Sequence, residues 1–196
     1  MTMREQAERD GHYLARGLLT DWFYQEVEDG LARTKLGHKT AIASFRQHPC
    51  ITELARELCG PDLTDTNEAV IHHNPTRIYD QWHYDYPFET ERVVPLWRFA
   101  IYFRDYTQSS GGLAVSVGSH VGKIADLDFR PHVIQSQPGD VVIWNLRTLH
   151  KPNAFVEGRP YSSPRNVIIF DYAAPSPELD KYIAWRLPKR QKEGRA

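Results

Sequence analysis

Two residues of this sequence have the types and the spacing of half a metal site. His83 and Asp85 lie two positions apart within residues 81–85, Gln-Trp-His-Tyr-Asp. On a β-strand, residues two apart project from the same face, so this imidazole and this carboxylate would meet at one point. A surface histidine–aspartate pair is the alternative, because the same spacing also arises by chance. A metal site therefore requires a second histidine.

His150 is the best candidate for that second histidine. It ends residues 138–150, which have the pattern of a turn followed by an apolar strand over 140–145. Two histidines and one carboxylate leave coordination positions open, and this set favours non-haem Fe(II) that activates O2. We predict that His83, Asp85 and His150 bind the metal.

Arg165 is the candidate for holding a co-substrate. It opens the apolar stretch 165–173, and a guanidinium among apolar neighbours can bind a carboxylate through two parallel hydrogen bonds. A paired surface arginine is the alternative for this residue. The rest of the sequence must form a scaffold that brings the candidate metal ligands and Arg165 together.

Short strands punctuated by Gly, Pro and Ser make up that scaffold. They are predicted at residues 68–73, 77–85, 96–106, 113–117, 132–137, 140–145 and 165–173. Because no helices separate them, we expect antiparallel sheets in a jelly roll or small barrel. Helices are predicted from Thr20, from Pro49 to Gly60, and from residues 176–178, with a solvated basic tail at 189–192.

Composition excludes several classes of protein. The 196 residues fit one domain, and 24 Lys and Arg against 25 Asp and Glu give a net charge of −1. This balance favours neither nucleic acid nor an anionic membrane as a partner. No apolar run approaches the roughly 20 residues of a membrane helix, and residues 1–21 lack the pattern of a secretory signal, so we expect a cytoplasmic protein. Cys50 and Cys59 fall on opposite faces of one predicted helix, where they cannot form a disulfide with each other.

Several motifs in order resemble the phytanoyl-CoA dioxygenase family of Fe(II)/2-oxoglutarate oxygenases. The resemblance runs from residues 10–19 to Ala173 and includes the His-x-Asp pair. Residues 111–120 are similar to the family's glycine–leucine strand and Gly-Ser-His turn, although Val117 stands where the family usually has proline. Residues 139–150 are similar to its Gly-Asp strand and distal histidine, and Arg165 falls where the family places its 2-oxoglutarate arginine. The chain is short for the group.

The resemblance implies a mainly β protein with flanking N-terminal helices, built as a double-stranded β-helix of the jelly-roll, cupin-like type. Residues 1–62 would form a helical support, 63–175 the jelly-roll core, and 176–196 a C-terminal helix and basic tail. It implies iron on His83, Asp85 and His150 and the distal carboxylate of 2-oxoglutarate on Arg165.

The activity that the resemblance implies is oxidation by O2 of a C–H bond in a small molecule, with release of succinate and CO2. Hydroxylation is the simplest outcome, and desaturation, ring closure and epimerisation stay open. Halogenation is disfavoured because Asp85 fills the position that a halide would need. The family acts on acyl thioesters, amino acids, phosphonates and natural-product scaffolds, and the sequence does not choose among them.

Strand alternation predicts which side chains line the pocket. Trp97, Phe99, Ile101 and Phe103 are expected in the core, with Arg98, Ala100, Tyr102 and Arg104 facing the pocket. Besides Arg165, the predicted co-substrate contacts are Gln81, Tyr102 and His73, and for His73 a structural role in polar packing is an equally good alternative. The predicted substrate contacts are Arg98, Tyr79, Arg77 and Arg104. Pairing of the two β-strand arginines with Glu89 or Glu91 is an equally good alternative. His120 is expected to be structural, and Trp82 and Trp144 are expected to pack in the outer layer.

Two other functions are compatible with parts of this pattern. One is a cupin-like metal-dependent hydrolase or isomerase, with Zn2+ for example, that does not use 2-oxoglutarate. Arg165 argues against it. The other is a non-catalytic jelly-roll binding module, against which the ordered set of His83, Asp85 and His150 argues.

Overall fold

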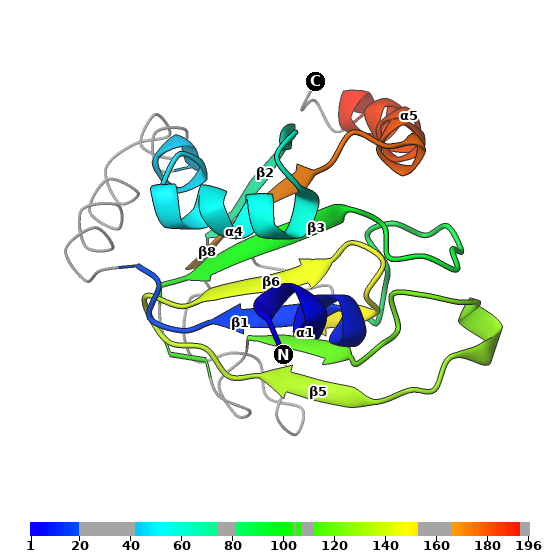
Figure 1. Ribbon diagram of the computed structural model, residues 1–196, viewed down its shortest axis with the longest axis horizontal. Coiled ribbons are helices and arrows are strands. Elements are labelled where there is room, and N and C mark those ends of the chain that lie inside the picture. Colours follow the sequence, from blue (N-terminus) through cyan, green and yellow to red (C-terminus); the bar gives the residue numbers. More distant parts are fainter. Residues whose placement is uncertain (20–41, 74–80, 104, 107–111, 153–165, 193–196) are drawn as a thin grey trace.

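Two antiparallel sheets face each other in the computed structural model, which describes residues 1–19, 42–73, 81–103, 105–106, 112–152 and 166–192 (Figure 1). One sheet has the order β1 (His12–Ala15), β6 (Val141–Asn145), β3 (Leu96–Tyr102), β8 (Asn166–Ala173), β2 (Thr64–His73). The other has the order β5 (Pro131–Ile134), β4 (Leu113–Ser116), β7 (His150–Pro152). This arrangement confirms the predicted jelly roll.

The outer face of the five-stranded sheet is covered by α1 (Met3–Asp10) and α4 (Pro49–Cys59) (Figure 1). Alternate β3 residues reach this layer, and one apolar cluster joins them to Ile51, Ala55 and Leu58 of α4. The β3 members are the predicted core residues Trp97, Phe99 and Ile101, with Phe103 just beyond the strand. The predicted core face of this strand is therefore confirmed.

The space between the two sheets holds a second apolar cluster. Ala100 and Tyr102 of β3 meet Leu113 and Val115 of β4 there. Trp144 of β6 also belongs to this inner cluster, so its predicted place in the outer layer is wrong. Val141 and Ile143 pack in the outer cluster, and residues of even number on β6 must then face inward, because side chains alternate along a strand.

The C-terminal helix α5 (Pro177–Lys192) follows β8 in the chain. Its Leu179 and Tyr182 pack with Tyr86, Leu96 and Leu146 in a third apolar cluster. The helix begins where the sequence predicted. It continues through residues 189–192, which we expected to lie beyond it as a frayed tail, because Lys, Arg and Gln are good helix formers.

The N-terminal part contains more strand than the sequence indicated. Strand β1 lies within residues 1–62, predicted as helical support, and pairs with β6 at the edge of the large sheet. Gly11, at φ 76°, ends α1 directly before this strand. Four residues carry little local signal, and the pairing with β6 stabilises them as a strand. The helix predicted from Thr20 lies outside the described residues.

The other predicted elements agree in kind and differ at their ends. Helix α4 has Pro49 in its first turn and Gly60 directly after it, as predicted. Cys59 is buried and Cys50 half-buried, and both are free thiols. Of the strand predicted at 77–85, residues 77–80 lie outside the described part, and in residues 81–85 only His83 forms a β-bridge.

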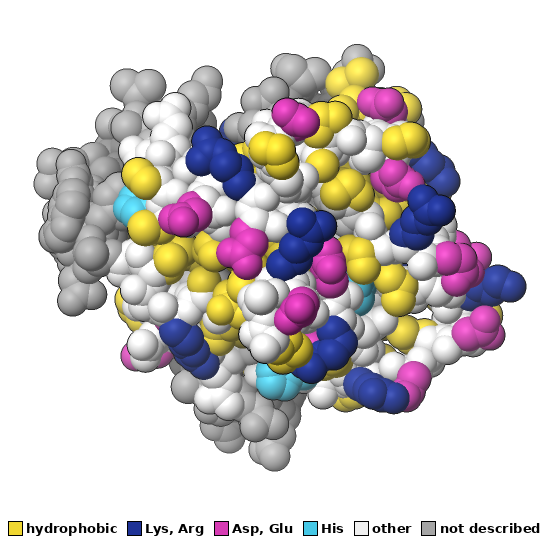
Figure 2. All heavy atoms as spheres, viewed as in Figure 1, with side chains coloured by type: hydrophobic (Ala, Val, Ile, Leu, Met, Phe, Trp, Pro, Cys, Tyr) yellow, Lys and Arg dark blue, Asp and Glu magenta, His cyan; other side chains and the backbone are white. Residues whose placement is uncertain are grey.

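Basic and acidic side chains are interspersed over the face shown in Figure 2, in keeping with the near-neutral net charge. Among the described residues, no helix combines the length and the apolar character needed to cross a bilayer.

Candidate metal centre

A β-bridge pairs the backbones of the two predicted histidines. The His83 N–H donates to the His150 carbonyl at 2.9 Å, and the His150 N–H donates back at 3.0 Å. The Tyr86 N–H donates to the Leu146 carbonyl at 2.8 Å, which fastens the chain on the far side of Asp85. These bonds hold the His-x-Asp segment against the residues that lead into β7.

His83, Asp85 and His150 form one cluster. Each offers a possible ligand atom, and these atoms all lie within 4.8 Å of one another. Oδ2 of Asp85 is 3.2 Å from Nε2 of His150, and the two imidazole centroids are 4.3 Å apart. Residues from two distant parts of the chain therefore converge on a space that one metal ion could occupy.

Backbone carbonyls orient both imidazoles. Nδ1 of His83 lies 2.9 Å from the Gln81 carbonyl, and Nδ1 of His150 lies 2.8 Å from the Thr148 carbonyl. A carbonyl only accepts, so each Nδ1 carries the proton, and in the neutral ring each Nε2 keeps its lone pair. Metal-binding histidines are commonly held in this way by a partner on their other nitrogen.

The charges in the cluster suit a cation. Burial, and then the neighbouring His150, lower the pKa of His83, which favours its neutral form. Burial by itself raises the pKa of Asp85, but Arg98 and then His150 lower it by more, so that the pKa lies well below its usual range. A neutral imidazole and an ionised carboxylate are the forms that bind a metal ion.

Oδ2 of Asp85 is buried, and none of its contacts has the geometry of a hydrogen bond. Its nearest charged neighbour is the Arg98 guanidinium at 2.6 Å, and Nε2 of His150 lies 3.2 Å from it, so no backbone donor of the described residues occupies the side that faces the imidazoles. Two imidazoles and one carboxylate fit a divalent transition metal, and Fe(II) with open coordination positions in particular.

Arg98 and Asp171 lie next to the cluster. Arg98 Nη1 is 2.6 Å from Asp85 Oδ2, while its Nε and Nη2 donate to the two oxygens of Asp171 at 2.6 and 2.7 Å. The alternative in which Arg98 pairs with Glu89 or Glu91 is therefore wrong. Asp171 was not among the predicted site residues, although it stands in the strand predicted at 165–173.

Only some of the other predicted contact residues lie in the described part of the structure. Tyr102 is buried, with its ring centroid 4.8 Å from that of Tyr106, and Gln81 is exposed. The strand register pairs His73 with Asn166, the neighbour of Arg165, and Tyr102 with Val167. The described part excludes the side chain of His73 and all of Arg77, Tyr79, Arg104 and Arg165, so the roles proposed for these five residues stay predictions.

The Gly-Ser-His turn, residues 118–120, is hydrogen-bonded to the residue directly before His150. Ser119 Oγ donates to the Ser116 carbonyl at 2.6 Å and accepts from the Leu149 N–H at 2.9 Å. His120 is buried with Nε2 2.8 Å from the Glu8 carbonyl, which confirms its structural role. A supporting role for Ser119 was not predicted, although the motif that contains it was.

Arg147 contacts both the His-x-Asp segment and the residues that follow the Gly-Ser-His turn. Its guanidinium lies over the Tyr84 ring at 4.6 Å and donates to the Gly122 carbonyl at 2.9 Å. Trp82, the other aromatic neighbour of His83, packs edge-on against Phe129 at 4.9 Å. Trp82 thus packs against the loop around residues 118–130, and Tyr84 is connected to that loop through Arg147.

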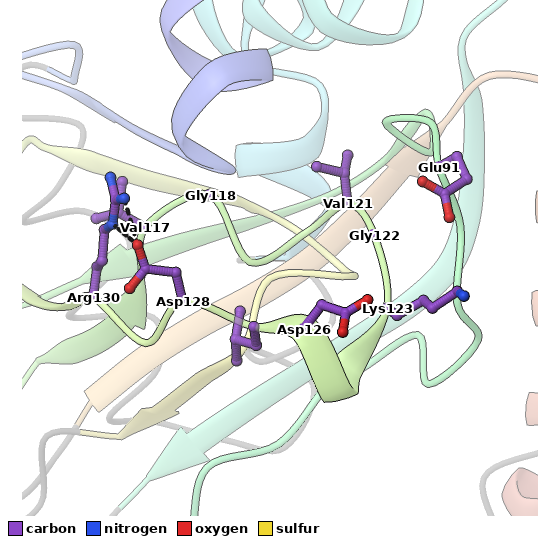
Figure 3. Close-up of a pocket in the computed structure, with 10 residues that line it drawn as sticks. Glu91, Val117, Gly118, Val121, Gly122, Lys123, Asp126, Asp128 and Arg130 are labelled. Atoms are coloured by element: carbon purple, nitrogen blue, oxygen red, sulfur yellow. Dashed lines mark hydrogen bonds and ion pairs between the residues drawn. The ribbon is translucent and has the colours of Figure 1, made fainter.

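A surface hollow of about 600 Å3 opens beside that loop (Figure 3). Glu91, Lys123 and Asp126 line it, together with the ion pair between Asp128 and Arg130. The lining contains none of the three cluster residues. The hollow is therefore separate from the candidate metal centre.

Two opposed antiparallel sheets around a cluster of two histidines and a carboxylate define a jelly-roll protein of the non-haem metal-enzyme class. The family model described as phytanoyl-CoA dioxygenase (PhyH) matches residues 1–154, and the chain belongs to this family. No curated protein matches the chain. The protein is accordingly a non-haem Fe(II)- and 2-oxoglutarate-dependent oxygenase. Membership of this family speaks against the hydrolase and binding-module alternatives.

Solved structures share the fold at low sequence identity. A nickel complex of the non-haem monooxygenase ThoJ is 18% identical with a TM-score of 0.66, over 89% of this chain and 78% of that chain. The 2-oxoglutarate-dependent epimerase SnoN from nogalamycin biosynthesis is 17% identical with a TM-score of 0.68, over 88% and 81%. EctD from S. alaskensis, solved with 2-oxoglutarate and 5-hydroxyectoine, is 16% identical with a TM-score of 0.67, over 89% and 76%.

Proposed function

We propose that the protein uses Fe(II) bound by His83, Asp85 and His150 to oxidise, most simply to hydroxylate, an unactivated C–H bond of a small molecule. The observation that carries this proposal is the convergence of the three ligand atoms within 4.8 Å. Both Nδ1 atoms lie within hydrogen-bonding distance of carbonyls, so Nε2 is the nitrogen of each ring that would bind the metal. When bound, Fe(II) with 2-oxoglutarate activates O2 for C–H oxidation, with succinate and CO2 as products.

The residues of this chain contribute orientation and charge. Nε2 of each histidine and the carboxylate of Asp85 would hold the metal, with Asp85 as the one anionic ligand. A set of three protein ligands would leave coordination positions for the keto acid and O2. Asp85 also occupies the position that a halide would need, which favours hydroxylation over halogenation.

We further propose that Arg165 binds the distal carboxylate of 2-oxoglutarate. Support comes from the register, since Asn166 and Val167 lie opposite His73 and Tyr102. The backbone thereby gathers three predicted co-substrate residues, or their immediate neighbours, at the same end of β2, β3 and β8. Gln81 completes the proposed contacts from the side of the metal cluster.

Structures that share this fold belong to enzymes with different outcomes. One is described as an epimerase and another, SnoK, as a carbocyclase of the same nogalamycin pathway. The fold therefore does not choose the reaction, and hydroxylation of a small-molecule substrate is proposed because it is the simplest outcome of C–H oxidation.

An anaerobic titration tests the ligand assignment. Apo-protein that receives both Fe(II) and 2-oxoglutarate should develop a visible metal-to-ligand charge-transfer band, and neither component alone should produce it. His83→Ala and His150→Ala should lose the band while keeping a cooperative unfolding transition, since the apolar clusters stabilise the fold. A band of full intensity in either variant would remove that histidine from the set.

A further inference from the structure

Arg98 is the side chain that connects the metal cluster to the centre of the large sheet. It lies on β3, where its direct neighbours are Trp144 on β6 and Asp171 on β8. Its side chain and that of Asp85 are each 16% exposed, and that of Asp171 is 1% exposed. A charged group at such a position needs a structural or chemical reason.

The contacts of its guanidinium divide into two sets. Nε and Nη2 donate to both oxygens of Asp171 at 2.6 and 2.7 Å. This two-point contact fixes the plane of the guanidinium. Nη1 is left to contact Asp85 Oδ2 at 2.6 Å. Asp171 therefore holds Arg98, and Arg98 in turn holds Asp85.

Asp85 needs such a restraint. It lies outside the regular strands, between the bridge at His83 and the bond from the Tyr86 N–H. Those bonds fix the backbone but leave the rotation of the carboxylate free. The contact with Arg98, which is anchored on a central strand, turns the carboxylate toward Nε2 of His150.

The charge of Arg98 alone would oppose this role, because a guanidinium beside a metal site repels the metal cation. Asp171 cancels that charge through the two-point contact, so the pair as a whole is neutral. The arrangement lets Arg98 orient the carboxylate with little repulsion of the metal.

We infer that Arg98 is a positioning residue for the metal ligand Asp85, and that Asp171 neutralises and orients Arg98 for this task. The inference rests on the ligand set proposed above. It gives Arg98 a role other than the predicted contact with substrate, and it assigns a role to Asp171, which the sequence reasoning did not consider.

The charge-balanced double variant Arg98→Met/Asp171→Asn provides the test. It removes a neutral pair, so simple electrostatics predicts the same affinity for a divalent cation as in the parent protein. Positioning predicts weaker binding, by about 10- to 100-fold, as is typical when the partner of a metal ligand is lost. The measurement is an anaerobic titration with Co(II) alone, followed by its d–d absorption, with circular dichroism to verify the fold.

Single variants separate the two effects further. Arg98→Met removes a positive charge, so electrostatics predicts tighter Co(II) binding and positioning predicts weaker binding. Arg98→Lys keeps the charge, loses the planar fork, and should weaken binding less than Arg98→Met; this milder variant carries the test if the double variant does not fold. Arg16→Met is the matched control, because Arg16 also contacts a buried aspartate, Asp140, but lies away from the cluster.

Unchanged or tighter Co(II) binding in folded Arg98 variants would overturn the inference and leave the ligand assignment intact. Failure of the assignment has a different signature: the parent protein would not bind Co(II), or His83→Ala would bind it equally well. Weaker binding with an altered d–d spectrum in the double variant, beside a parent-like Arg16→Met, is the expected result.

Discussion

The two ends of the large sheet each bury an aspartate beside an arginine, and they treat the carboxylate differently. At one end, directly before β6, the Asp140 side chain is 0% exposed. Its Oδ1 accepts from the Gly17 N–H at 2.8 Å, and its Oδ2 accepts from Arg16 at 2.8 Å and the Gln137 N–H at 3.1 Å. This carboxylate is satisfied by the protein itself.

At the other end, Asp85 has an arginine beside it and an oxygen without a hydrogen bond. Two imidazoles face that oxygen instead of backbone N–H groups. The difference between the ends shows how a buried carboxylate can be interpreted. One whose acceptors are filled by backbone donors closes a turn, and one that lies beside other ligand atoms without backbone donors is a candidate metal ligand.

The largest expected effect is the loss of turnover when a proposed metal ligand at the Asp85 end is removed. Asp85→Ala or His150→Ala should abolish 2-oxoglutarate turnover, because the metal loses one of three protein ligands. The measurement is succinate formed under saturating Fe(II) and O2, with a denaturation curve to verify folding. Asp140→Asn, at the other end, should retain turnover. Parent-like succinate formation by the Asp85 variant would refute the assignment of its carboxylate.

The second effect asks whether the Asp140 end also takes part in the reaction. Strand β8 begins at Asn166 at that end of the sheet; in the sequence Arg165 directly precedes Asn166, and Arg159 lies six residues before Arg165. Losing one partner of a buried two-point pair costs about 3–5 kcal/mol, against about 0–1 for an exposed pair. Arg165→Ala should therefore raise the apparent KM for 2-oxoglutarate by orders of magnitude, and Arg159→Ala should change it little. The reverse ranking in steady-state titrations would shift the assignment to Arg159.

The third expected effect is on the free energy of unfolding, which should respond differently to substitution of Asp140 and of Asp85. Asp140→Asn weakens charge-assisted bonds to two backbone N–H groups and Arg16, and we expect a loss of about 1–3 kcal/mol in the free energy of unfolding. Asp85→Asn in the metal-free protein should cost more, because burial raises the pKa of Asp85 but the ion pair with Arg98 lowers it well below its usual range, and the ionised carboxylate therefore stabilises the folded state. Urea denaturation of both variants without metal measures the difference. A smaller loss for the Asp85 variant would contradict this view of the two ends.

The smallest effect concerns the turn behind the metal end. Burial lowers the pKa of His120 in the folded protein, so the unfolded chain binds this proton more readily. The contribution of neutral His120 to stability is present above its unfolded pKa of about 6.5, and it is lost as the pH falls toward the folded value. Unfolding measured between pH 7 and 5 should show stability falling by up to about 1 kcal/mol per pH unit for this group. His120→Gln should flatten that slope, and an unchanged slope would exclude His120 as its source.

The sequence by itself determined which residues could do the chemistry and much of the scaffold. The period-two pattern of residues 97–103 identified the core face of β3, and Pro49 with Gly60 marked both ends of α4. The motifs around His83, Asp85 and His150 predicted three residues that the structure brings together as a group that could hold a metal ion. All of these signals are local, because alternation, caps and motif spacing are written in neighbouring residues.

Tertiary structure decided which groups meet. Trp144 faces the inner cluster because the pairing of β6 with its neighbours sets its face, and a shift of one residue would turn it outward. Strand β1 exists because β6 offers an edge for it. Arg98 and Asp171 are 73 residues apart, and only the register of β3 against β8 places them side by side next to Asp85. Contacts at such separations depend on how the strands assemble, and the local pattern that predicts each strand contains no information about that assembly.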